Sequence, residues 1–95
     1  MNKHLITITP EGKVDPVMVT LSAGDTVRFQ NKAGALAVLK FQEKSLFGKI
    51  VYRIKGGTAL PLHIHRKASS DTYFYEVKLE SDMKPRPGSP CIILD

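Results

Sequence analysis

The chain has 95 residues, a length that suits one domain with one hydrophobic core. Its hydrophobic fraction of 42% and charged fraction of 24% are ordinary for a folded protein, and no apolar run approaches the roughly 18 residues of a membrane helix. The only cysteine, Cys91, excludes an internal disulfide and any multi-cysteine zinc site.

The amino-terminal stretch, MNKHLITITP, reaches Pro10 without the continuous apolar run that an export signal needs. We therefore expect a cytoplasmic protein, or a periplasmic or secreted one if an export signal precedes residue 1. No cofactor-binding motif is evident in the sequence, and we expect no cofactor.

The net charge of +5 is unevenly distributed along the chain. Residues 28 to 67 carry nine basic side chains against the single acid Glu43, a net charge of +8. Such a segment could attract an acidic protein or nucleic acid, although a solvated basic face without a partner is the simpler explanation. No arginine-rich run or glycine-rich loop strengthens the nucleic-acid interpretation, and we expect no membrane partner.

Alternating apolar and polar residues predict strands in the first third of the chain. The alternation occurs in HLITIT at 4 to 9, in VMVTL at 17 to 21 and in TVRFQN at 26 to 31. Between the last two, SAGD at 22 to 25 supplies a glycine for positive φ and an aspartate that can cap a turn. We therefore expect residues 17 to 21 and 26 to 31 to form a hairpin-like pair.

The middle third is more ambiguous. The stretch LAVLKF at 36 to 41 is apolar enough for a strand buried on both faces or for a short helix, and we favour the strand. In EKSLFGKIVYRIK, at 43 to 55, the apolar residues also fit the spacing of a basic amphipathic helix. Gly48 and the β-branched, aromatic run after it favour a turn followed by a strand at 49 to 54, which is what we predict.

The last third again indicates strands. After the break at Gly56 and Gly57, we expect extended structure in LPLHIH at 60 to 65 and a strand in TYFYEVKL at 72 to 79. A proline-rich connection at 80 to 90 leads to the terminal apolar strand CIIL. Seven or eight short strands with few helical signals predict an all-β fold, an antiparallel sandwich or small barrel.

The order of these features resembles the cupredoxin family. In the first half, the resemblance rests on VDPVMVTLSAGDTVRFQNKAG, in which a strand, a Gly-Asp turn, a strand and an asparagine follow one another. In the second half, it rests on TYFYEV, the loop and the closing CIIL. The resemblance covers most of the chain and is weakest between residues 40 and 66. It implies one cupredoxin-like domain over residues 1 to 95, with a Greek-key antiparallel β-sandwich of seven to eight strands.

The copper ligands of that family have poor counterparts here. A blue copper ion needs two imidazoles, a thiolate and usually a weak thioether. The first histidine would follow Asn31, where this chain has KAGALAVLKF. Val77 aligns near the family's cysteine and Glu80 near its second histidine, so only Met83 could match a ligand. We therefore expect a copper-free, non-catalytic binding module and not an enzyme.

His63 and His65 raise an alternative, a site for another metal. Residues two apart in an extended strand share a face, so both imidazoles could reach one ion. The spacing from Gly57 resembles the opening of a cupin metal motif, but the glutamate of that motif is missing and Asp71 comes one place late. We favour two surface histidines among lysines, at the end of the sandwich opposite the family's copper loop, and expect no metal ion.

A sandwich without a reaction centre can still bind through its end loops or an exposed edge strand. Our first hypothesis places binding at the end formed by the loops at 31 to 36 and 80 to 90, because a proline-stiffened loop loses little entropy on binding. Its candidate residues are Asn31, Lys32, Glu80, Met83, Lys84 and Arg86. A second hypothesis uses the basic segment 28 to 67. We expect an unknown protein partner, and an edge strand could also pair two copies into a homodimer.

Overall fold

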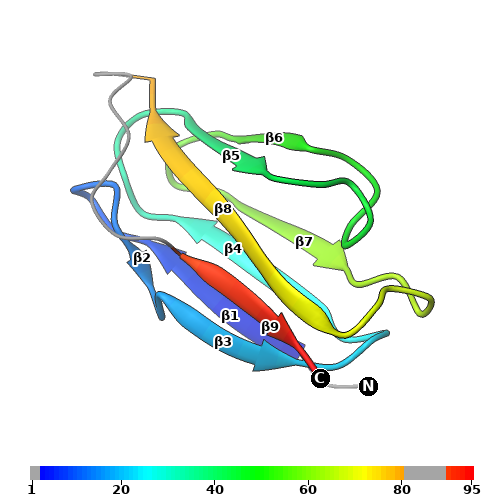
Figure 1. Ribbon diagram of the computed structural model, residues 1–95. Helices are drawn as coiled ribbons and strands as arrows, with labels where there is room; N and C mark the ends of the chain where they lie inside the picture. Colours follow the sequence, from blue (N-terminus) through cyan, green and yellow to red (C-terminus); the bar gives the residue numbers. More distant parts are fainter. Residues whose placement is uncertain (1–2, 81–89) are drawn as a thin grey trace.

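The computed structural model describes residues 3–80 and 90–95, which form two β-sheets packed face to face (Figure 1). The four-stranded sheet has the order β2 (Val14–Asp15), β1 (Lys3–Ile8), β4 (Thr26–Asn31), β7 (Ala59–His63). The five-stranded sheet has the order β3 (Met18–Leu21), β9 (Cys91–Leu94), β8 (Asp71–Leu79), β5 (Ala37–Phe41), β6 (Val51–Ile54). Within these described ranges, no helix is long and apolar enough to cross a membrane.

The core lies between the sheets and follows the period-two pattern of the sequence. Along β8, the side chains of Tyr73, Tyr75, Val77 and Leu79 are buried because alternate residues of a strand face the same side. Phe29 of β4 meets them from the opposite sheet, with its ring centroid 5.9 Å from that of Tyr75. The aromatic residues thus join the two sheets into one core.

The prediction of an all-β sandwich is confirmed, but its pairing is mixed. β1 pairs with β4 in parallel, and β3 pairs with β9 in parallel, whereas the other described pairs are antiparallel. The two-residue strand β2, which is too short for a periodic signal, was not predicted. Its presence brings the strands of the described residues to nine.

The predicted hairpin between residues 17 to 21 and 26 to 31 is wrong. β3 and β4 lie in different sheets, so the turn between them carries the chain across the sandwich. Asp25 closes this turn, because its backbone N–H donates to the Ser22 carbonyl and its carboxylate accepts the Ser22 N–H. Leu21 and Val27 are both buried, so each strand turns its apolar side to the shared core from opposite sheets.

The ambiguous segment 43 to 55 is a turn followed by a strand, as predicted. Residues 43 to 50 have no regular secondary structure, and β6 follows at Val51–Ile54. The loop nevertheless contributes to the core, because Leu46 is fully buried and the Phe47 ring packs edge to face on Phe41. These two apolar residues, which gave the segment its helical spacing, cover the sheets from a loop.

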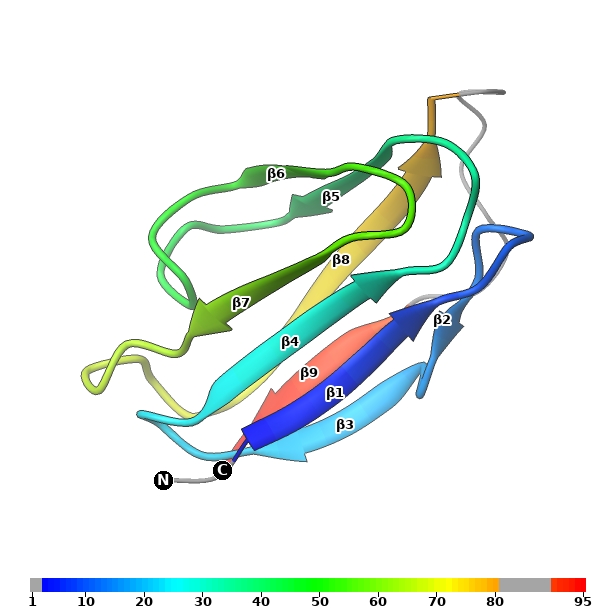
Figure 2. The same ribbon diagram turned by 180° about the vertical axis from the view of Figure 1, so that it is seen from behind.

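The loops gather at two ends of the sandwich. At one end, the loop after β4 meets the end of β8, where the Glu80 N–H donates to the Leu36 carbonyl. At the other end lie the β3–β4 turn and residues 64 to 70, which connect β7 to β8 (Figure 1). Figure 2 shows the outer face of the four-stranded sheet, with β7 at its free edge.

Candidate binding surface around strand β7

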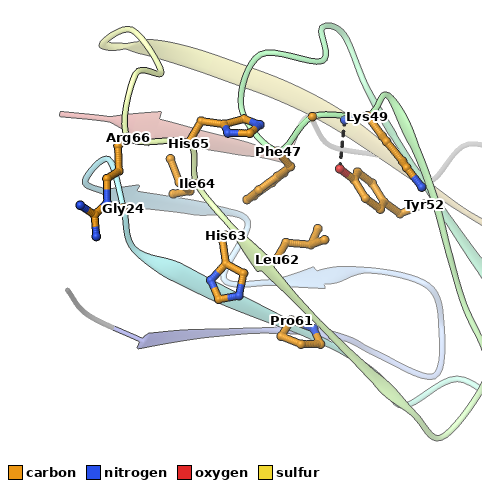
Figure 3. Close-up of a pocket in the computed structure, with 11 residues that line it drawn as sticks. Gly24, Phe47, Lys49, Tyr52, Pro61, Leu62, His63, Ile64, His65 and Arg66 are labelled. Atoms are coloured by element: carbon orange, nitrogen blue, oxygen red, sulfur yellow. Dashed lines mark hydrogen bonds between the residues drawn. The ribbon is translucent and has the colours of Figure 1, made fainter.

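The two histidines of LHIH do not share a strand face. β7 ends at His63, and the chain then turns, because the Ile64 N–H donates to the Asp25 carbonyl and the His65 N–H donates to the Leu46 carbonyl. In Figure 3, the imidazoles of His63 and His65 lie on different sides of the chain. His65 therefore lies beyond the end of the strand that carries His63.

His63 belongs to the outer face of the four-stranded sheet. Its Nδ1 atom is 2.8 Å from the hydroxyl oxygen of Thr26, the residue directly opposite on β4. In the tautomer that carries its proton on Nε2, His63 accepts the Thr26 hydroxyl hydrogen at Nδ1. This hydrogen bond fixes the ring over the sheet.

His65 instead lies over the loop at 46 to 49. A Cβ atom on Gly48 would approach the His65 Nε2 atom to 3.2 Å, which is tighter than ordinary contact. Gly48 also has a φ of 102°, a conformation that favours glycine. Because Gly48 has no side chain, the His65 imidazole can pack closely against the loop.

The third candidate ligand, Asp71, lies elsewhere. It begins β8 opposite Leu94, accepts a hydrogen bond from the Thr72 N–H, and lines a small depression together with Glu43. Neither His63 nor His65 lines that depression. Among the residues that the structure describes, no group of three His, Cys, Asp or Glu side chains could hold a metal ion.

A groove of about 710 Å³ crosses the outer face of the four-stranded sheet. The register arranges its residues in rows: Lys3, Thr26 and His63 form one row, and Leu5, Arg28 and Pro61 form the next. Gln30 and His4 complete the lining. Since neighbouring strands lie about 4.8 Å apart and rows about 6.8 Å apart, the Cα atoms of Lys3 and Arg28 are separated by roughly 8 Å.

A second depression, of about 670 Å³, lies on the other side of β7 (Figure 3). The Lys49 backbone N–H donates to the Tyr52 hydroxyl at 3.1 Å, which ties the loop to β6. Burial raises the pKa of the Tyr52 hydroxyl, and this hydrogen bond lowers it by a smaller amount. The residues lining the depression are Gly24, Phe47, Gly48, Lys49, Tyr52, Pro61, Leu62, His63, Ile64, His65 and Arg66.

The charge around β7 is cationic. Among the residues that the structure describes, no Asp or Glu lines either depression, and Lys3, Arg28 and Lys49 form no ion pair. The buried Asp25, which lines neither depression, has its carboxylate 3.1 Å from the His4 Nε2 atom. The two depressions share Pro61 and His63, so they form one surface around the edge strand, which we term the β7 surface.

Pro61 protects the free edge of β7. Ile64 bonds to the turn before β4, because its N–H donates to the Asp25 carbonyl and its carbonyl accepts the Gly24 N–H. Alternation along the antiparallel pair therefore directs the backbone groups of Leu60 and Leu62 toward β4 and those of Pro61 away from it. A proline at this position removes a donor that would otherwise recruit another strand. The β7 surface is therefore better suited to side-chain contacts than to strand pairing.

The opposite end presents fewer of its predicted residues. Asn31 is fully buried: its Nδ2 donates to the carbonyls of Ala35 and Ile54, and its Oδ1 accepts the Ala33 N–H. Lys32 and Glu80 are exposed, whereas Met83, Lys84 and Arg86 lie outside the described residues. Asn31 thus holds the loop together from within.

Solved structures with a similar fold include cupredoxins. The chain is similar to the novel purple cupredoxin from Nitrosopumilus maritimus, with a TM-score of 0.68, 11% identity and coverage of 96% of this chain and 98% of that one. It is also similar to a reduced Cu(I) form of a mutant amicyanin, with a TM-score of 0.67, 17% identity and coverage of 96% and 80%. A pseudoazurin from Sinorhizobium gives a TM-score of 0.54, 15% identity and coverage of 100% and 75%. No family model and no curated protein sequence matches the chain.

The chain therefore has the cupredoxin fold, as its sequence resemblance implied. Val77, the residue aligned near the family's cysteine, is buried in the core opposite Leu39.

Sequence reasoning found only part of the β7 surface. It identified the basic segment and the histidine pair, but Lys3 lies outside that segment and reaches it only through the parallel pairing of β1 with β4. Arg28 alternates outward in a strand whose Val27 and Phe29 are buried, a signal that the period-two pattern does contain. The alignment of these residues in rows across the strands depends on the register of strand pairing, which the sequence does not reveal.

Proposed function

We propose that the chain is a non-catalytic, cupredoxin-like binding module whose β7 surface binds an acidic segment of another polypeptide. The observation that carries this proposal is the diagonal pair Lys3 and Arg28, two exposed cations on one sheet face with no acid among the described residues that line their groove. Unpaired cations beside apolar Leu5 and Pro61 favour a ligand that offers both carboxylates and side-chain carbon.

The spacing of the cations suits an extended acidic peptide. Alternate side chains of an extended chain recur about every 6.8 Å, the same interval that separates the rows of Lys3 and Arg28. Carboxylates on alternate residues of a peptide lying along the sheet could therefore meet successive rows. Lys49 could engage a peptide that continues around β7.

Nucleic acid is a weaker candidate for the same surface. Single strands bind best where aromatic rings offer free faces for base stacking. Within residues 3–80 and 90–95, no Phe, Tyr or Trp lines the groove of Lys3 and Arg28. In the other depression, Phe47 and Tyr52 pack edge to face on each other and on Phe41.

The reactive side chains support a binding role over catalysis. Cys91 is buried on β9, where its thiol is shielded from substrates. The imidazole of His63 bonds to Thr26, and the carboxylate of the buried Asp25 is bonded to His4. A nucleophile, a base and an orienting acid within mutual reach, which covalent catalysis needs, are not assembled among these residues.

The proposal can be tested with a fluorescein-labelled decaglutamate peptide and fluorescence anisotropy at low salt. We expect a Kd below about 1 mM that weakens steeply as salt shortens the Debye length to about 8 Å at 0.15 M. The double variant Lys3→Glu/Arg28→Glu should weaken binding at least about tenfold, because it replaces two attractive charge contacts with repulsive ones.

The matched control is Lys40→Glu/Arg53→Glu. These residues form the same diagonal arrangement between β5 and β6 on the outer face of the five-stranded sheet, so the net charge changes equally. The control should alter the Kd by less than about threefold, the effect of net charge alone. Equal losses in both variants, or tighter binding of a single-stranded oligonucleotide of equal charge, would count against the proposal.

A further inference from the structure

The strand β3 leaves its outer edge open. β9 pairs with it in parallel, and the N–H groups of Cys91 and Asp95 donate to the carbonyls of Val17 and Leu21. In a parallel ladder, alternate residues face the partner, so the N–H and carbonyl groups of Met18 and Thr20 point away from β9. Among the described residues, none is hydrogen-bonded to these groups.

The other three sheet edges are protected. β2 has only two residues, and β7 carries Pro61 at an outward backbone position. β6 carries Arg53 and is flanked by Lys49 and Lys55, charges that oppose strand addition. The edge of β3, by contrast, contains neither proline nor charge from Val17 to Gly24.

The side chains along the same edge are apolar and exposed. Val17 and Met18 are 51% and 59% exposed. The register continues Met18 into a row with Cys91 and Phe74 across the outer face of the sheet, but Phe74, on β8, lies two strands in from the edge. An open edge beside such a face is a typical site of strand addition.

We propose that two copies of the chain pair antiparallel through β3, about a two-fold axis at Val19. This register sets Met18 of each copy opposite Thr20 of the other. Both residues present their backbone donors and acceptors outward, so each pair can exchange two hydrogen bonds, four in all. The two five-stranded sheets then form one continuous sheet.

Two copies of the chain can approach each other with the least charge repulsion along β3. A chain of net charge +5 repels its own copies, and the repulsion is strongest where residues 28 to 67 concentrate a net charge of +8. Residues 14 to 27 carry Asp15 and Asp25 and no basic side chain. Two-fold pairing through β3 therefore brings the copies together where no cation opposes another cation.

Analytical ultracentrifugation over a wide concentration range tests this pairing. The wild-type chain, with a monomer mass of 10.5 kDa, should reach dimer mass as its concentration rises. The double variant Met18→Lys/Thr20→Lys sets lysine directly opposite lysine on both sides of the axis, and it should raise the dimer dissociation constant at least about tenfold.

The matched control is Phe74→Lys/Thr72→Lys, on β8. These residues lie on the same sheet face and in the same two rows as Met18 and Thr20, but away from the edge. The control adds the same charge and should retain the dimer. A wild-type chain that stays monomeric to millimolar concentration overturns the proposal, as does a dimer lost equally in both variants.

Amide hydrogen exchange provides a readout that does not depend on any variant. The amides of Met18 and Thr20 should become protected as the wild-type concentration rises, because they then donate across the axis. The amide of Val51, on the charged edge strand β6, should exchange at an unchanged rate. Protection that spreads equally to Val51, or that is absent from Met18 and Thr20, contradicts the pairing.

Discussion

Asn31, which the sequence suggested as a binding residue, instead stabilises the fold. Its fully buried amide makes two hydrogen bonds within the loop after β4, to Ala33 and Ala35, and a third to the carbonyl of Ile54 in β6. Asn31→Ala should lower the free energy of unfolding by about 2–4 kcal/mol, because it leaves two carbonyls and one N–H without their partner. Urea denaturation measures the change, and Gln30→Ala, which removes a half-buried amide on the outer face, should cost less than about 1 kcal/mol.

Tyr75 and Tyr73 are two core tyrosines whose hydroxyls differ in hydrogen bonding. The Tyr75 hydroxyl has no hydrogen-bond partner among the described residues, whereas that of Tyr73 donates to the Ser69 carbonyl at 2.6 Å. Tyr75→Phe should therefore leave stability unchanged or raise it by about 1 kcal/mol, and Tyr73→Phe should lower it by a similar amount. Thermal unfolding would contradict this account if both variants lost stability equally.

The Tyr75 hydroxyl also predicts a loss of stability at alkaline pH. Burial raises the pKa of this hydroxyl above its ordinary value of 10.0, and Cys91 raises it further. Because the unfolded state releases the proton first, the contribution to stability is complete below pH 10 and declines as the pH rises beyond it. Urea denaturation from about pH 8 to about pH 11 should show a smaller decline for Tyr75→Phe than for the wild-type chain.

At the scale of elements, the sequence predicts strands well and their partners poorly. Alternation identified β4 and β8, since each has one buried face and one exposed face. Gly24 and Asp25 predicted the turn at 22 to 25. Whether that turn joins two paired strands or crosses between the sheets depends on the sheet in which each strand lies. That choice is made by long-range pairing, such as that of β3 with the carboxyl-terminal β9, which no local pattern encodes.

The loop at 43 to 50 illustrates the same limit and leads to a prediction. Leu46 is fully buried although it belongs to no strand, whereas Ile50 in the same loop is 40% exposed. Leu46→Ala should lower the free energy of unfolding by about 2–5 kcal/mol through the cavity it leaves. Ile50→Ala should cost less than about 1 kcal/mol, and equal costs in urea denaturation would show that Leu46 does not anchor the loop.

At the scale of the whole molecule, the cationic surface and the unprotected sheet edge lie on different strands. The cationic surface surrounds β7, while the uncharged open edge is β3, an edge strand of the other sheet. The β7 surface was only partly predictable, because Lys3 joins Arg28 through the register of β1 and β4. If both proposals hold, a dimer would present two β7 surfaces, and a long acidic partner could bind both with increased avidity.

The most direct measurement of the central proposal is a titration of the isotope-labelled chain with decaglutamate, followed by amide resonances. The proposal predicts that the largest shifts occur at Lys3, Arg28 and His63, and that they disappear at high salt. Shifts centred on Lys32 and Glu80, at the opposite end of the sandwich, would contradict it. So would the absence of any shift at millimolar peptide.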